Sequence, residues 1–102
     1  MNLYKYTAIF TPERGEKDVY NVTFPSFPEI ATFGESRAEA VYMAQDALEL
    51  SILSRLEDGE KIPNDKKPSK LPKNSFSQEM LVTVVHEVNS SPLTQNVKTA
   101  LA

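Results

Sequence analysis

The sequence predicts an α+β domain in which one long helix covers one face of a four-stranded mixed sheet. Strands are predicted on both sides of residues 37–58, by period-two alternation before them and by a β-branched apolar run after them, and within residues 37–58 apolar residues recur at helical spacing. The length of 102 residues allows a single domain over 1–102 with one modest core. With 40% hydrophobic and 25% charged residues, the composition is that of an ordinary globular protein.

Three strands are expected before the helix. Residues 3–10 and 19–24 alternate with period two, each with its aromatic residues on one face, and a polar connection between them predicts a hairpin. Pro25 and Pro28 each remove a backbone donor and interrupt strand pairing. A short third strand is therefore expected at residues 30–33.

The helix is expected to begin after Ser36, whose side chain can accept from the amide of Glu39 while Glu39 reaches back to the amide of Ser36. Gly59 is the expected left-handed residue just past its end, and Pro63 prevents resumption. The predicted apolar stripe contains Val41, Ala44, Leu48, Ile52 and Leu56. This stripe is typical of a helix packed on a sheet.

Three segments are expected after the helix. Residues 59–76 combine prolines and lysines with few apolar residues, which predicts an exposed, mobile loop. Residues 80–88 are β-branched and apolar on both faces, which predicts a fourth strand inside the sheet. Residues 89–102 are expected to be a short tail or a short terminal helix.

Connection rules then predict the strand order. Short connections favour antiparallel neighbours, and a helical crossover favours a parallel partner, so the fourth strand is placed parallel to the first in the order 3-2-1-4. The helix covers only one face of this sheet. Apolar residues on the other face need the terminal helix or a second copy of the chain to cover them, and a homodimer is predicted.

No catalytic, cofactor or metal site is expected. The chain has no cysteine, a single histidine, His86, and three widely separated glycines, which excludes thiolate sites, imidazole clusters and phosphate-cradling loops. Acidic residues on the helix are expected to be solvated. The remaining enzymatic alternative is a metal-dependent nuclease that uses Asp46 or Glu49.

Charge and targeting signals suggest where the protein acts. The sequence shows neither an amino-terminal leader pattern nor an apolar run long enough for a membrane span, so a cytoplasmic protein without membrane contact is expected. The net charge of −3 does not favour nucleic acid. It divides into +3 over residues 59–75 and −6 elsewhere, so a basic loop adjoins an acidic body.

Five segments together resemble a known family. Residues 6–10, 22–28, 32–40, 44–50 and 56–63 resemble, in order and spacing, the amino-terminal domain of HicB-like antitoxins. The resemblance covers roughly residues 4–63. One departure is that Glu29 and Ile30 stand where the family commonly has a small residue and often a cysteine.

The resemblance implies a partial RNase H-like βββαβ fold and a function. Such a domain binds and masks a small, basic, mRNA-cleaving HicA-like toxin and is not itself a nuclease. Family members that repress their operon carry a carboxy-terminal DNA-binding module, whereas about a dozen residues follow the predicted fourth strand here, so direct DNA binding is not expected. A shortened chain, a natural single-domain relative and a minimal interaction helix all stay open.

The function predicted from these observations is that of an antitoxin in a type II toxin–antitoxin system. The alternative is an orphan domain of the same fold that serves in oligomerisation or as a scaffold. The toxin-binding candidates are Phe27, Glu29, Thr32 and Glu35. For Phe27, an exposed anchor and a cap on the core are both open, and Glu35 serves equally as contact or helix cap. The candidates for a dimer face are Ile30, Thr32, Leu81 and Val85.

Overall fold

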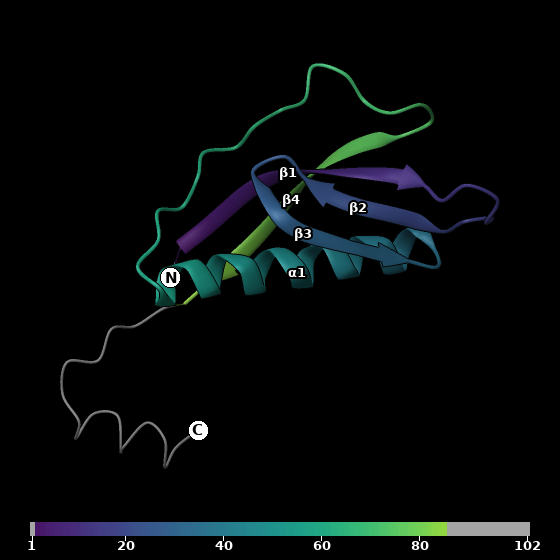
Figure 1. The fold of residues 1–102 in the computed structure, drawn as a ribbon. Helices are drawn as coiled ribbons and strands as arrows, with labels where there is room; N and C mark the ends of the chain where they lie inside the picture. Colours follow the sequence, from purple (N-terminus) through teal and green to yellow (C-terminus); the bar gives the residue numbers. More distant parts are fainter. Residues whose placement is uncertain (1, 86–102) are drawn as a thin grey trace, which may run out of the picture.

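A computed structural model describes residues 2–85 of the chain (Figure 1). Its elements, in order, are β1 (Asn2–Pro12), β2 (Tyr20–Phe24), β3 (Phe27–Gly34), α1 (Arg37–Glu57) and β4 (Phe76–Val84). The strands form one sheet in the order β3-β2-β1-β4, and α1 lies along one of its faces. The α+β class and the strand order are thereby confirmed. The predicted terminal segment 89–102 lies outside the described residues.

The predicted mixed sheet is wrong, because β4 runs antiparallel to β1 and all strand pairs are antiparallel. The helix does not lead directly into β4. Residues 58–75, here called the strap, first return along the length of the sheet, so β4 starts beside the end of β1, with Phe76 opposite Phe10. Eighteen extended residues can span roughly 60 Å, whereas β1 is roughly 36 Å long. The strap is therefore long enough to return along the sheet and let β4 run antiparallel to β1.

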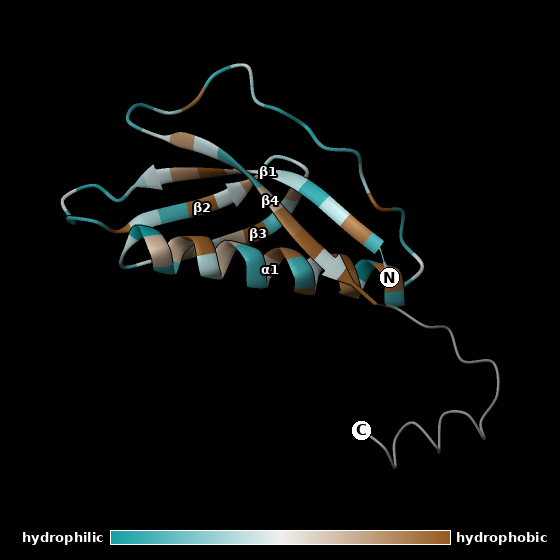
Figure 2. Ribbon diagram, turned by 180° about the vertical axis from the view of Figure 1, so that it is seen from behind, coloured by the Kyte–Doolittle hydropathy of each residue, from teal (hydrophilic) through white to brown (hydrophobic). Residues whose placement is uncertain are grey.

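Alternation along the strands builds the core against α1. Figure 2 shows hydrophobic residues alternating with hydrophilic ones along the strands, as the period-two pattern predicts. The helix contributes Ala40, Ala44, Leu48 and Ile52, all fully buried. The buried sheet residues are Tyr6, Ala8, Phe10, Val22, Phe24, Phe27, Ile30, Met80, Val82 and Val84.

Both ends of α1 are capped by side-chain and backbone bonds. Ser36 Oγ accepts from the Glu39 amide at 3.0 Å, as predicted, but the Glu39 carboxylate accepts from the Glu35 amide rather than from Ser36. At the other end Gly59 has φ of 72°, its amide donates to Leu56 O, and the next amide donates to Arg55 O. This pair of bonds is a Schellman motif, which confirms Gly59 as the left-handed residue.

Most residues of the strap are exposed, and hydrogen bonds join its first half to the sheet. The Tyr6 hydroxyl donates to Pro63 O, and burial raises the pKa of this hydroxyl. Ser26 Oγ donates to Asn64 O at 3.0 Å and accepts from the Lys66 amide at 2.8 Å. These bonds hold the first half of the strap along the part of β1 that β2 is too short to reach.

The last strand buries only one of its faces, so the expectation that both faces are buried inside the sheet is wrong. Met80, Val82 and Val84 face the core, whereas Leu81 and Val85 are 51% and 64% exposed. The register pairs Leu3 with Thr83 and Lys5 with Leu81, so Leu3 is a diagonal neighbour of Leu81 on the face away from the core. Leu3, itself 66% exposed, joins Leu81 and Val85 in what is here called the β4 apolar patch.

Candidate functional site

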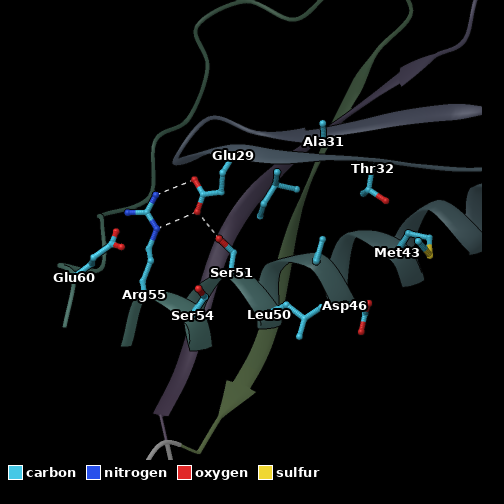
Figure 3. A pocket seen from close by; sticks show the side chains of 12 residues that line it. Glu29, Ala31, Thr32, Met43, Asp46, Leu50, Ser51, Ser54, Arg55 and Glu60 are labelled. Atoms are coloured by element: carbon cyan, nitrogen blue, oxygen red, sulfur yellow. Dashed lines mark hydrogen bonds and ion pairs between the residues drawn. The ribbon is translucent and has the colours of Figure 1, made fainter. Parts of the chain in front are cut away.

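A groove of about 720 Å³ runs between β3 and α1 (Figure 3). Four consecutive β3 residues, 29–32, form one wall, and one face of α1 forms the other. Since β3 ends the sheet order, no described strand pairs with its outer edge. The helix residues along the groove are Met43, Asp46, Ala47, Leu50, Ser51, Ser54 and Arg55, with Glu60 of the strap at one end.

An ion pair joins the two walls of the groove. Arg55 donates to both carboxylate oxygens of Glu29, at 3.0 Å from Nε and 2.9 Å from a terminal nitrogen, and Ser51 Oγ also donates to Glu29. The bonds from Arg55 are the main cause that lowers the pKa of Glu29 to about 2, and the Ser51 bond adds to it. Glu29, predicted as a toxin contact, is therefore held within the chain as a carboxylate, with its side chain 44% exposed.

Phe27 lies in the core beneath this ion pair. Its ring is 0% exposed and packs edge-on against Tyr6, with the centroids 4.8 Å apart. The guanidinium of Arg55 lies 4.9 Å from the centroid of the Phe27 ring. Phe27 is thus the core-capping residue of the two alternatives, and the expectation of an exposed aromatic anchor is wrong, because strap residues close over the loop that carries it.

The other two candidates for toxin binding are separated from one another. Thr32 is half-buried and lines the groove together with Glu29. Glu35 is exposed in the connection from β3 to α1, outside the groove lining. The structure therefore brings Glu29 and Thr32 together and leaves Glu35 apart.

The four residues predicted for one dimer face do not share a face. Ile30 is 6% exposed and belongs to the core, so it is not available to a second copy. Thr32 lies on β3, whereas Leu81 and Val85 lie at the opposite edge of the sheet, on and just after β4. The strand order therefore places these positions at two opposite edges of the sheet.

Residues that sequence reasoning missed supply most of the groove. Leu50 is 59% exposed, Arg55 crosses to Glu29, and Glu60 was counted only as part of the loop. The signal available in the sequence was the spacing of residues 43, 46, 47, 50, 51 and 54, which repeats every three or four positions beside the apolar stripe. A second helix face with this spacing is typical of a second contact surface.

The acidic helix residues do not form a metal site in the described part of the chain. Asp46 lines the groove and also borders a smaller depression, which Glu49 shares with Leu3 and Tyr42. Within residues 2–85, no three side chains of the metal-ligating types come together. Over the same residues, α1 is too polar to cross a membrane.

Two solved structures share this fold. One chain of a toxin–antitoxin complex from Streptococcus pneumoniae superimposes with a TM-score of 0.70 at 19% identity, covering 98% of this chain and 97% of that one. The amino-terminal domain of Burkholderia pseudomallei antitoxin HicB gives 0.59 at 22% identity, covering 81% of this chain and all of that one. At these identities the likeness is one of fold.

Sequence comparison adds a closer relative. The antitoxin HicB 1 of Photorhabdus laumondii subsp. laumondii is 47% identical over 53 residues. The alignment covers 52% of this chain but 34% of that protein, so this chain spans about a third of the relative's length. A family model described as HicB_like antitoxin of bacterial toxin-antitoxin system matches residues 5–87, and the chain therefore belongs to the HicB-like antitoxin family.

Proposed function

We propose that this chain is an antitoxin that binds a small, basic, HicA-like mRNA-cleaving toxin and masks it, with no enzymatic activity of its own. The observation that carries the proposal is the family match over residues 5–87, which includes most of β1 and all of β2, β3, α1 and β4. A chain of a toxin–antitoxin complex with the same fold over nearly its whole length supports it. The proposed place of action is the cytoplasm, where mRNA is available.

The charge distribution supports a basic partner. The lysines are in excess over residues 59–75, which carry +3, and the rest of the chain has a net charge of −6. An acidic body attracts an RNA-binding protein, whose own surface must be basic to contact phosphates. Such complementarity mainly speeds encounter and selects the partner, while the packed contacts set the affinity.

An RNA-cleavage assay with a purified cognate toxin tests the proposal. Titrating this protein into the toxin should abolish cleavage at a fixed stoichiometry, and the protein alone should leave the RNA intact with Mg²⁺ present. Unimpaired cleavage at a large excess of this protein would overturn the antitoxin function and favour the orphan scaffold. Cleavage by the protein itself, lost in D46N or E49Q, would restore the nuclease alternative.

A homodimer is proposed through the β4 edge. The three residues of the β4 apolar patch are all more than half exposed, and they adjoin a strand whose outer edge has no described partner. Edge pairing would cover both the apolar side chains and the free backbone groups. This assignment leaves the β3 edge at the other side of the sheet accessible.

A further inference from the structure

The groove between β3 and α1 has two walls that suit an added strand. β3 presents an unpaired edge, so alternate residues of 29–32 direct backbone donors and acceptors outward. The facing helix wall supplies Met43, Ala47 and Leu50 as an apolar surface. An extended segment beside β3 would form main-chain bonds on one side and pack alternate side chains on the other.

The charges of the groove select the kind of segment. Arg55 and Glu29 neutralise each other through their two-pronged bond. Asp46 and Glu60 remain, and neither forms an ion pair with any residue in the described part of the chain. Figure 3 shows them toward opposite ends of the row of groove side chains, with Leu50 and Ser54 between them.

The spacing of these two carboxylates sets the length of the segment. Twelve positions separate Asp46 from the C-cap Asp58, which at the helical rise of 1.5 Å per residue is roughly 18 Å, and Glu60 follows two residues after this cap. In a strand, six residues advance by about the same distance and return to the same face. Two basic side chains at positions i and i+6 of a strand therefore match the two carboxylates.

We propose that this groove binds an extended, basic segment of the partner toxin as a fifth strand beside β3, with cationic side chains near Asp46 and Glu60 and apolar ones on Leu50. The identity of the partner as a toxin rests on the proposed function. The fit of a basic strand to the groove does not depend on that function. Leu50 and the unpaired edge of β3 supply the contact area for the bound segment. The two carboxylates orient this segment and select a basic partner.

Two other occupants fit the charges less well. A second copy of this chain would bring another Asp46 and Glu60 to the same groove, so like charges would meet. The chain's own residues 86–102 contain one lysine and one glutamate, which gives no net positive charge to select them. A basic partner segment is the occupant that the groove charges favour.

A matched pair of peptides tests the groove without the toxin. The probe is a blocked heptapeptide, Lys-Thr-Val-Thr-Val-Thr-Lys, which places both lysines and both valines on one face of a strand. The control peptide replaces both lysines with glutamates. Adding the lysine peptide to ¹⁵N-labelled full chain should shift amides of residues 29–32 and of the groove face of α1, while β4 amides and the glutamate peptide give no shifts.

Charge reversal then links the groove to the toxin. The double variant D46K/E60K should weaken binding of the lysine peptide and of the cognate toxin by about tenfold or more, because two favourable pairs become repulsive. The control E49K/E57K makes the same change in net charge at exposed helix positions outside the groove lining, and should bind both ligands within about twofold of wild type. Thermal melts of both variants show whether the fold is kept.

The outcomes separate this inference from the proposed function. If wild type inhibits the toxin and D46K/E60K inhibits it equally well, the groove is not the toxin-binding site, and the antitoxin function is unaffected. Absence of toxin inhibition by wild type overturns the function, and the peptide titration then decides the groove alone. The inference that the groove binds a basic strand is overturned by any of three results. These are shifts centred on β4, equal shifts with the glutamate peptide, and no shifts at millimolar peptide.

Discussion

The carboxylate of Asp65 accepts two hydrogen bonds from Thr7, one from its backbone amide and one from its hydroxyl, both at 2.9 Å. The two residues lie 58 positions apart in the sequence. β2 pairs with β1 only as far as Ile9, so the amide of Thr7 has no strand partner on that side. Asp65 takes the place of the missing strand, and Thr7 is left 5% exposed.

Removing the Asp65 carboxylate should therefore destabilise the fold. In D65A the buried amide and hydroxyl of Thr7 both lose their acceptor, which should lower the free energy of unfolding by about 1–3 kcal/mol. Urea denaturation measures this loss, and amide exchange at Thr7 should accelerate with it. K66A, at the next strap position with an exposed side chain, should change stability by less than about 0.5 kcal/mol. Equal stability of D65A and K66A would contradict the anchoring role.

The Glu29–Arg55 pair should make stability depend on pH at the acidic end. Because the pKa of Glu29 is lowered to about 2 from its ordinary 4.5, its ionised form stabilises the folded state. That contribution is fully present above about pH 4.5 and is lost as the pH falls through 2. Solvent screening of the half-exposed pair limits it to about 1 kcal/mol.

The comparison that isolates this effect uses two glutamine variants. E29Q should be less stable than wild type at pH 7, and the difference should shrink between pH 4.5 and 2 because protonation removes the same charge. E35Q removes an exposed carboxylate that forms no ion pair within residues 2–85, and should follow the wild-type curve. A wild-type minus E29Q difference that stays constant over this range would exclude the ion pair as its source.

The local elements could be predicted from the sequence because their signals are local. Alternation located the aromatic faces that carry Tyr6 and Phe10, and Ser36 and Gly59 marked the two ends of α1. The direction of β4 could not be predicted from such signals. It depends on the strap crossing the sheet, and the bonds that hold the strap, such as Asp65 to Thr7, join residues with no pattern between them.

The candidate site was predicted only in part for a similar reason. Glu29 and Thr32 were identified from the segment around β3, and both line the groove. Arg55 was missed because its partnership with Glu29 crosses from the last turn of α1 to β3. For Phe27 the sequence left an exposed anchor and a core cap both open, because the strap and Arg55, which cover it, lie outside its own segment.

A close contact at the start of α1 gives a third prediction. A Cβ added at Gly34 would lie 2.2 Å from the backbone nitrogen of Ala40 and 2.5 Å from its Cα, so the end of β3 and the first turn of α1 would have to separate. G34A should cost about 1–3 kcal/mol of stability, as overpacking against rigid backbone does. A31V adds volume on the same strand at an exposed position and should be nearly neutral in the same urea titration. A G34A protein as stable as wild type would show that this junction yields easily.

The last prediction concerns self-association through the β4 apolar patch. Leu3 on β1 and Leu81 and Val85 at the β4 edge lie on the same face of the sheet, where they form one contiguous exposed apolar patch. Replacing Leu81 with lysine places a charge in the middle of that patch and next to the backbone edge, a change that natural edge strands use against pairing. Sedimentation velocity at micromolar concentration should show wild type as a dimer and L81K as a monomer. L71K adds the same charge on the strap, at a position 39% exposed, and should remain dimeric. If L71K dissociates and L81K does not, the interface involves the strap, and an 11.4 kDa monomer for wild type would exclude the dimer altogether.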